Sequence, residues 1–575
     1  MNYRSLTCEE IDRLIERGNY AADWSKVEVA ETFRCEQLTH SRLLGRVRVG
    51  EGASIFNSTI ENYAIGARSR IESITRLECR RCSSFGNGVM VATMNECEGR
   101  QVKIYDRMSA QIAYMLAIYR HRPGLIERLE QMIDRYAEER SSDLGEVGED
   151  CHLNGARFIR EMRIGNRVTV DGATTLENGT LCDDVRVGVD VKAYDFIMAE
   201  GARVANGVMI ERCFVGESVI MDKGFSAMES LFFANSHCEN GEAAAIFAGP
   251  YTVSHHKSSL LIAGMFSFFN AGSGTNQSNH LFKSGAVHQS VHPRGCKFAS
   301  SAYVMSPALE GAFTVILGKH SHHHDTSAFP YSYLIEKEGR STLMPGANLK
   351  SYGLVRDIEK WPKRDKRRLK RDCINFEEYN PYIAQSLITA LTTLNRLREE
   401  EPEAEFLNYK RVFIQRAILM RGVKLYQKAI VASLGDLLSR GSHCAECDGS
   451  GRWLDMAGQY IAKSYVEQLI AQIERGEIAS MEQIDERFRQ FLTRYDDYAH
   501  HWALCAYEKL RGRQPGEREV EDVITAGRNA HAALRELTDE DRRKDCSMEM
   551  AVSYGLDSDS EEELRADYYN VRGLN

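Results

Sequence analysis

A short phrase recurs along much of the first 350 residues of the chain: an aliphatic residue, glycine, a polar residue, any residue, and a small or aliphatic residue. Its clear copies are Val49–Ala53, Ile65–Ser69, Val147–Cys151, Ile164–Val168, Val187–Val191 and Val215–Val219. Several copies begin 16 or 17 residues apart, which is about the spacing of a six-residue unit used three times per coil. One coil cannot bury its row of aliphatic side chains alone, so the pattern requires coils that stack on one another.

The repeat resembles the hexapeptide repeat of the left-handed parallel β-helix, and the resemblance covers roughly residues 43–350. In such a fold, glycines and other small residues turn the corners between flat faces. We therefore predict an all-β left-handed parallel β-helix over residues 43–354, after an N-terminal helical segment at residues 1–42. An ordinary β-sandwich with many short strands is the alternative.

Two stretches interrupt this pattern. Between residues 105 and 140, apolar residues recur at helical spacing on both sides of Arg122-Pro-Gly124, which predicts an inserted helical hairpin. We expect the hairpin to pack against the coils, and a lid over a site is the alternative. We interpret residues 355–374 as a basic linker, either solvated or forming an exposed helix face, rather than as a nucleic-acid or anionic-membrane patch. Residues 375–575 return to a period near 3.6 and predict an all-α C-terminal domain.

Composition and charge narrow the class of protein. The 575 residues are enough for two or three domains. No apolar run approaches the ~20 residues that span a bilayer, and the start of the chain lacks the apolar core of a signal peptide. The net charge of −9 implies no general attraction to nucleic acid, and the fifteen scattered cysteines suggest reduced thiols. We therefore expect a cytoplasmic protein with neither nucleic acid nor a membrane as a partner.

Ten of the seventeen histidines lie between His237 and His324. The same stretch holds the glycine-rich and amide-rich segment Asn270–His280. Histidine has an ordinary pKa of ~6.5, so it moves protons in both directions near neutrality, and it is also the commonest metal ligand. Glycines beside it expose the backbone to a ligand. We therefore place the functional site in this stretch, with a solvated histidine-rich surface loop as the alternative.

Three residues of this stretch stand at characteristic intervals: His256, Asn270 fourteen residues later, and Asn279 nine residues after that. The pattern Asn270-x-Gly-x-Gly-Thr-x-x-x-Asn279 resembles the acetyltransferase half of bifunctional bacterial glucosamine-1-phosphate acetyltransferase/uridylyltransferase. The resemblance implies that His256 is the general base of acyl transfer and that the two asparagines orient the sugar and the acyl group. It also implies a coenzyme A thioester as the donor and a sugar or nucleotide-sugar-like acceptor with an amine or hydroxyl.

Further residues complete the expected site. Gly272 and Gly274 would let a ligand approach the backbone, whose N–H groups can stabilise an oxyanion. The other expected substrate-binding residues are His280, Lys283, His288 and His320. As a whole, the chain resembles a bacterial family that joins such a β-helix to a helical C-terminal domain. Related transferases place their active sites between subunits, so we expect a homotrimer.

Two other functions remain open on the sequence. A zinc enzyme similar to the gamma-class carbonic anhydrases could draw ligands from His288, His292, His320, His322, His323, His324 and Asp325. We predict no tightly bound metal there, because Pro293 and Gly295 argue against a helix that presents two of these histidines together. A non-catalytic sugar-binding or scaffold role is the other alternative, since β-helices also serve as rigid platforms.

A pair of cysteines lies in the helical half of the chain. The segment from Cys444 to Gly451 has the spacing CxxCxGxG, which matches a unit in the zinc domain of the 40-kDa heat-shock chaperones. Tetrahedral zinc needs four ligands, and only one copy of the unit is present. We therefore expect a glycine-rich turn between helices, with a zinc site as the alternative.

Overall fold

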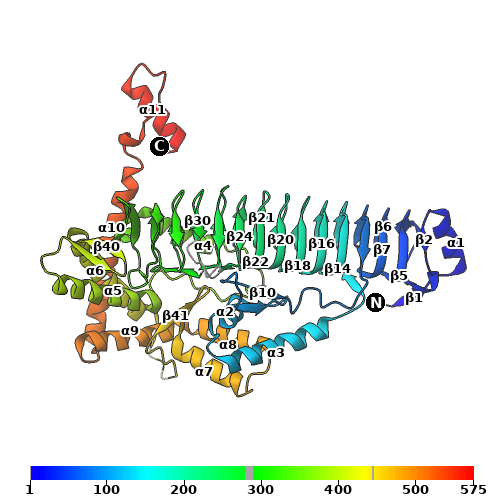
Figure 1. Cartoon of the computed structure of the whole chain (residues 1–575), viewed down its shortest axis with the longest axis horizontal. Coiled ribbons are helices and arrows are strands. Elements are labelled where there is room, and N and C mark those ends of the chain that lie inside the picture. The colour runs from blue at the N-terminus through cyan, green and yellow to red at the C-terminus, as the bar shows by residue number, and fades with distance from the viewer. Residues whose placement is uncertain (1, 279–288, 443, 445, 575) are drawn as a thin grey trace.

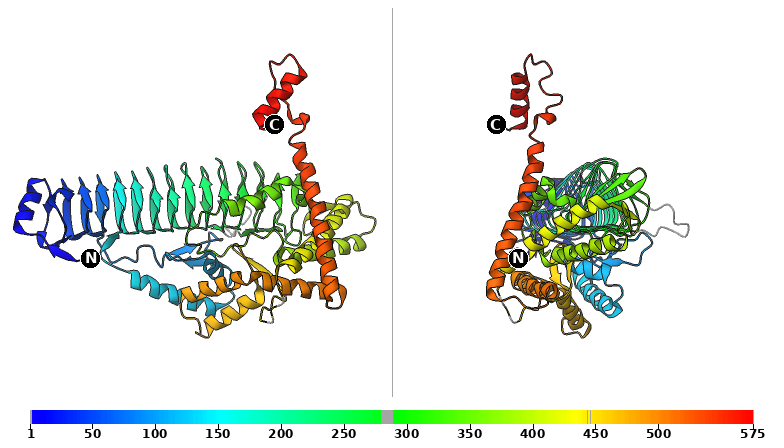
Figure 2. Two further views of the ribbon diagram at one scale, coloured as in Figure 1. Left: turned by 180° about the vertical axis from the view of Figure 1, so that it is seen from behind. Right: turned by 90° about the vertical axis from the view of Figure 1, so that its left-hand side faces the viewer.

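The structure of the protein is a computed structural model that describes residues 2–278, 289–442, 444 and 446–574. It shows a β-solenoid of about 18 turns, followed by a C-terminal region built mainly of helices (Figure 1). The solenoid forms a long rod, and the helical region lies along one side and at one end of it (Figures 1 and 2). The predicted parallel β-helix with a helical C-terminal domain is therefore confirmed.

Each regular coil of the solenoid has one long strand and one short strand. The long strands β14 (Phe158–Ile164), β16 (Thr175–Leu181), β18 (Lys192–Met198), β20 (Met209–Val215) and β22 (Ser226–Phe232) pair in parallel at a register of 17 residues. Each bends at its centre, where one residue has a positive φ: Glu161, Asn178, Asp195, Arg212 or Glu229. Short strands such as β15 (Thr169–Asp171) and β17 (Arg186–Val187) form a second parallel sheet. A bent long strand and a short strand together give each coil three faces.

The interior of the rod consists of stacked columns of buried side chains. One column holds the aliphatic residue that opens the repeat, in register from coil to coil through Val49, Ile65, Val147, Ile164, Leu181, Met198, Val215, Phe232, Ala248 and Phe266. A column on the short-strand sheet runs through Leu153, Val170, Val187, Val204, Met221 and Cys238. Buried apolar surface contributes roughly 25 cal/mol per Å², so it is the stack, rather than any one coil, that stabilises the rod.

Strand pairing begins earlier than the sequence indicated. Two short strands, β2 (Tyr20–Ala21) and β3 (Val27–Ala30), already pair in parallel with β5 (Arg42–Val49). The expected helical segment at residues 1–42 is therefore only partly helical, with one α-helix, α1 (Cys8–Glu16), at that end of the rod (Figure 1). Strands of two to four residues are too short to show a periodic pattern in the sequence.

A long insertion interrupts one coil at the bend of its long strand. The chain leaves the rod after β9 (Arg76–Glu78) and returns at β12 (Gly145–Val147), and both pieces pair with neighbouring coils. Between them lie a β-hairpin and the helices α2 (Ala110–Ile118) and α3 (Pro123–Arg140), so the predicted helical hairpin is confirmed. Pro123 opens α3, where its missing N–H costs no helical hydrogen bond. The hairpin was expected to pack against the coils, and both of its helices contact helices of the C-terminal region.

The C-terminal region combines helices with short hairpins. Its helices are α4 (Tyr352–Lys363), α5 (Pro381–Glu400), α6 (Arg416–Arg440), α7 (Lys463–Glu474), α8 (Met481–Thr493), α9 (Tyr495–Arg511), α10 (Glu517–Lys544) and α11 (Glu561–Arg572). Its hairpins are β37 (Tyr333–Lys337) with β38 (Arg340–Met344), β39 (Phe406–Tyr409) with β40 (Val412–Gln415), and β41 (Trp453–Met456) with β42 (Gln459–Ala462). Helix α10 crosses the end of the rod, and α11 projects beyond it (Figure 2). Within the described ranges, no helix is both long and apolar enough to cross a membrane.

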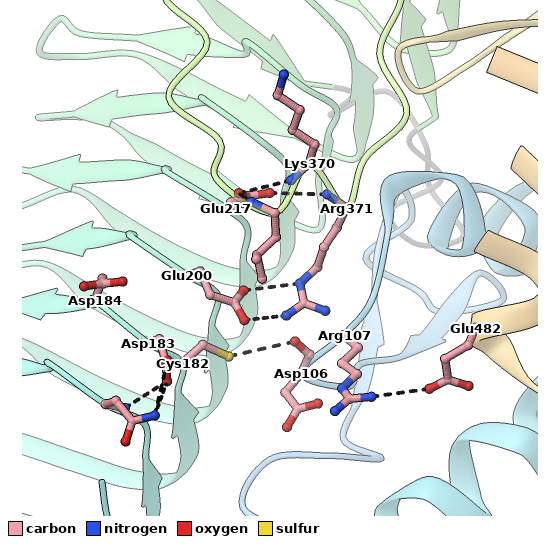
Figure 3. Close-up of polar contacts among 12 residues, drawn as sticks. Asp106, Arg107, Cys182, Asp183, Asp184, Glu200, Glu217, Lys370, Arg371 and Glu482 are labelled. Carbon is pink, nitrogen blue, oxygen red and sulfur yellow. Dashed lines mark hydrogen bonds and ion pairs between the residues drawn. The ribbon is translucent and has the colours of Figure 1, made fainter. Parts of the chain in front are cut away.

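The basic segment after α4 is not a solvated linker, which corrects the sequence interpretation. The carboxylate of Glu217 accepts hydrogen bonds from the backbone N–H groups of Leu369, Lys370 and Arg371 (Figure 3). The Arg371 guanidinium pairs with Glu200 on the preceding coil. The sequence showed the density of positive charge in this segment, but it did not show that acidic side chains of successive coils meet it in the folded chain.

Candidate functional site

A cavity of about 430 Å³ lies between α4 and the outer surface of the short-strand sheet, and we call it the α4 cavity. The solenoid lines it with Ser218, Ile220, Asn235, Ser236, His237, Tyr251, Val253, His255, Phe268, Phe269, Asn270 and Lys297. Helix α4 and the segment after it contribute Asp357, Lys360, Trp361, Arg364 and Lys366. A larger cavity of about 1080 Å³ beside α5 and α9 has no histidine in its lining. Of these two cavities, the α4 cavity is therefore the better candidate for proton-transfer chemistry.

The coil register places several of the lining side chains in one row. His237, Val253, Asn270 and Lys297 occupy paired positions on four successive coils. Side chains alternate between the two faces of a strand, so the residue after each of these points into the rod and is buried or nearly so. Neighbouring parallel strands lie about 4.8 Å apart, which puts Asn270 one strand from Lys297 and two strands from His237.

His255 stands at the edge of this row. It follows β26 (Val253–Ser254), is half-buried, and meets the ring of His237 edge-on with 4.3 Å between the ring centroids. Burial, assisted by the neighbouring His237, lowers the pKa of His255 to about 4. At neutral pH this side chain is therefore a neutral imidazole that can accept a proton.

Several positively charged side chains line the α4 cavity. Lys297 and Lys360 both pair with the carboxylate of Asp357. Burial by itself raises the pKa of Asp357, but the two lysines hold it below its ordinary value. Arg364 and Lys366 are exposed, and no acidic side chain in the described part of the chain forms an ion pair with either. Four cations against one carboxylate make the cavity suitable for an anionic ligand.

The structure describes two of the three predicted catalytic residues, and one of these two lines the α4 cavity. Asn270 lines the α4 cavity, whereas His256 is exposed in the turn after β26 and lies outside the lining. Its neighbour His255 lines the cavity instead. The predicted residues Asn279, His280, Lys283 and His288 lie outside the described residues.

The two predicted glycines lie in the turn that follows Asn270. Gly274 has a φ of +69°, in the left-handed region that favours glycine. A Cβ on Gly272 would lie 2.6 Å from the backbone of Ala299 on the next coil. The close stacking of the coils therefore explains why residue 272 is a glycine, whether or not a ligand binds there.

His320 belongs to a second group of histidines, which is buried at the end of the rod. His292 follows Phe266 in the interior column, and Glu310 comes next on the following coil. His292 Nδ1 lies 2.6 Å from one carboxylate oxygen of Glu310, and His324 Nε2 lies 2.9 Å from the other. His320 stands beside this group, with its ring centroid 6.1 Å from that of His324.

Within this buried group, the histidines and the carboxylate of Glu310 stabilise one another's charged forms. Burial alone raises the pKa of Glu310, but His292 and His324 lower it to about 2. Burial also opposes the charged form of His324, yet the hydrogen bond to Glu310 leaves its pKa above the ordinary value. Gln277 Nε2 lies 2.6 Å from His292 Nε2 on its other side. Each group has a partner inside the protein, so the arrangement is suited to holding the coils together.

Among the described residues, few groups of side chains have the geometry to bind a metal ion. His237, Glu239 and His255 have ligand atoms that all lie within 4.8 Å of one another, at the edge of the α4 cavity. Neither His292 nor the segment 320–324 belongs to such a group among the residues described. The expectation of no tightly bound zinc at those histidines stays a prediction.

Sequence reasoning missed the contribution of α4. Leu354, Ile358 and Trp361 are buried at intervals of four and three, the spacing of one face of a helix. Trp361 meets Phe268 edge-on with 4.7 Å between ring centroids, which anchors the helix over the cavity. This apolar spacing was present in the sequence, but the dense charge after it favoured a linker.

Together these features define a class of protein: a long parallel β-solenoid whose helical C-terminal region encloses a cation-lined cavity on the rod. Residues 53–398, more than half of the chain, match the family model described as domain of unknown function DUF4954, so the protein belongs to this family. Residues 438–575 match a second model, described as domain of unknown function DUF6819.

Two individual proteins show more distant similarity. An "Uncharacterized protein" of Treponema pallidum (strain Nichols) is 24% identical over 614 residues, which cover 88% of this chain and 83% of that protein. The crystal structure of a "putative acetyltransferase" from Desulfovibrio desulfuricans G20 matches 57% of this chain and 75% of its own, at 10% identity and a TM-score of 0.12. A TM-score this low carries no argument about activity.

Proposed function

We propose that the protein is an acyltransferase that moves an acyl group from a coenzyme A thioester to an amine or hydroxyl of a sugar-like acceptor, and that the α4 cavity is its site. One observation carries the proposal: the half-buried, neutral imidazole of His255 and the amide of Asn270 line the same cation-rich cavity. The sequence resemblance supplies the reaction, because this pair occupies nearly the interval that the resemblance implied. His255 replaces His256 as the base in the proposal, since His256 lies outside the cavity.

The proposed reaction needs only these side chains and the two substrates. His255 takes the proton from the amine or hydroxyl as that group attacks the thioester carbonyl. The oxyanion of the tetrahedral intermediate accepts a hydrogen bond from the Asn270 amide. The carbon–sulfur bond then breaks, and the leaving thiolate takes the proton back from the imidazolium. No covalent enzyme intermediate forms.

The direct test is a binding and turnover experiment on the full-length protein. Calorimetry with acetyl-coenzyme A tests donor binding, and a screen of sugar amines and sugar alcohols with the same donor tests transfer. We expect saturable binding and release of free coenzyme A with at least one acceptor. No binding of the thioester would contradict the acyltransferase proposal. Binding of sugars or sugar phosphates without any transfer would instead favour the non-catalytic binding role.

We expect the two unpaired cations to contribute to binding of the donor phosphates. An exposed ion pair is worth ~0.2–1 kcal/mol, so Arg364→Gln combined with Lys366→Gln should raise the Kd for coenzyme A by about 2- to 30-fold. The effect should shrink at high salt, because exposed charges are screened. Lys363→Gln is the matched control: Lys363 is the last residue of α4, directly before Arg364, is 74% exposed and does not line the cavity. An equal rise in the Kd for coenzyme A in the control would show that the effect comes from the overall loss of positive charge rather than from the cations that line the cavity.

We also propose that the chain assembles as a homotrimer, as the sequence analysis expected. Helices α2, α3 and α7 to α9 cover one side of the rod, and much of the remaining rod surface is free for a second copy (Figures 1 and 2). Sedimentation equilibrium should give about three times the 65.1 kDa chain mass at micromolar concentration. A mass near that of one chain would show that the helical region takes the place of a neighbouring subunit.

A further inference from the structure

Two cysteines lie close together between α6 and β41, far from the α4 cavity in sequence. Cys444 and Cys447 form a tight turn in which the Cys447 N–H donates a hydrogen bond to the Cys444 carbonyl, at 3.1 Å. Both sulfur atoms lie within 4.8 Å of each other and of an Asp497 carboxylate oxygen. The two thiols differ in access, since Cys444 is partly exposed and Cys447 is 1% exposed.

The surroundings of Cys444 favour a thiolate. Arg494 Nη2 lies 2.7 Å from Cys444 Sγ, and the guanidinium also pairs with Glu446, which stands between the two cysteines in the sequence. A hydrogen bond from the Cys447 thiol, and another from the backbone N–H of Glu446, lower the pKa of Cys444. Burial raises the pKa of Cys447. One sulfur is therefore accessible and activated, and the other is protonated and protected.

We propose that Cys444 and Cys447 are a redox-active dithiol that exchanges with a small-molecule disulfide, with Cys444 as the attacking sulfur and Cys447 as the resolving one. The Cys444 thiolate attacks one sulfur of the small disulfide, a mixed disulfide forms, and one small thiolate leaves. Cys447 then loses its proton to solvent and attacks Cys444 Sγ, and the second small thiolate leaves. The dithiol is oxidised by two electrons, and the small disulfide is reduced to two thiols.

A structural metal is the competing use of the same atoms, and the geometry disfavours it. Zinc in a structural site takes four protein ligands. Among the described residues, the group around Cys444 offers three: two sulfurs and the Asp497 carboxylate. The Arg494 guanidinium also places a positive charge against the sulfur that would bind the cation. A guanidinium stabilises a free thiolate but repels a metal ion.

The test uses the full-length protein, reduced, freed of reductant and incubated with glutathione disulfide at pH 7. Peptide mapping should find a disulfide between Cys444 and Cys447. Cys447→Ser should stop the reaction at one glutathione attached to Cys444, and Cys444→Ser should prevent both products. Cys505 is the internal control: it is also partly exposed, but burial raises its pKa.

The rate of alkylation by iodoacetamide measures the activation of Cys444. An ordinary thiol is only a few per cent thiolate at pH 7, so Cys444 should react on the order of 10-fold faster than Cys505. Arg494→Gln should remove part of this difference and leave Cys505 unchanged. Equal rates at the two cysteines, or a Cys447→Ser variant that traps no glutathione on Cys444, would overturn the proposal. So would one zinc per purified chain that is lost in both cysteine variants.

Discussion

His255→Ala should lower the rate of acyl transfer by about 10²–10⁴-fold, the contribution of a positioned general base. The alanine leaves the thioester bound, because the cations of the α4 cavity are unchanged, but nothing remains to take the proton from the acceptor. His255 is only half-buried, so its loss should leave the solenoid folded. The measurement is release of free coenzyme A at saturating donor and acceptor, with circular dichroism as a check of folding.

His256→Ala is the matched control for this variant. His256 is adjacent in sequence, of the same residue type and exposed outside the cavity, so its replacement should leave the rate unchanged. The opposite result, with His256→Ala inactive and His255→Ala active, would return the base to the residue that the sequence resemblance implied. Full activity in both variants would end the proposed mechanism.

The dependence of the rate on pH gives a second measure of the same base. Only the neutral imidazole accepts a proton, so kcat/KM should rise as pH increases through about 4, the pKa of His255 in the free protein, and then remain level to neutrality. An anionic substrate bound beside the imidazole stabilises its charged form and raises that pKa. The midpoint for kcat should therefore lie at higher pH than the midpoint for kcat/KM.

Glu310→Ala should destabilise the C-terminal coils of the solenoid by about 3–5 kcal/mol, the typical cost of removing one partner from a buried ion pair. The substitution leaves His292 and His324 inside the rod without the carboxylate that they share. Glu403→Ala is the control: Glu403 is exposed, and its removal should change stability by no more than about 0.5 kcal/mol. Hydrogen exchange of β31 (Ser290–His292) and β34 (Ala308–Leu309) reports this opening locally.

The stabilisation by this buried group should be largest in mildly acidic solution. The pKa of Glu310 is lowered to about 2 in the folded protein, so its contribution is present above its unfolded pKa of ~4.3 and is lost as pH falls through 2. The pKa of His324 is raised, so its contribution is complete below ~6.5 and is lost as pH rises through the folded value. The difference in stability between wild type and Glu310→Ala should therefore peak between about pH 4.5 and 6.5. A difference that does not change with pH would mean that the carboxylate acts by packing alone.

The proposed site was only partly predictable from the sequence. Asn270 was proposed from a local motif, and the register of the coils places it in the α4 cavity with Lys297. The assignment of His256 rested on an interval alone, and an interval does not state which of two adjacent side chains faces a cavity. His255 and His256 follow β26 and are not part of a strand, so no regular alternation sets their directions, and only the folded chain decides which of them lines the cavity.

The sequence by itself determined the architecture of the rod and of the helical insertion. Both follow from short-range periodicity: an aliphatic side chain must be buried once per face of each coil, and the helices of the insertion must bury one stripe each. Only the tertiary structure decided where the site lies. Helix α4 and the basic segment after it meet coils far earlier in the chain, where Trp361 packs on Phe268 and Arg371 pairs with Glu200. Such contacts depend on the shape and charge of a surface that exists only once the coils have stacked, so no local pattern in the sequence records them.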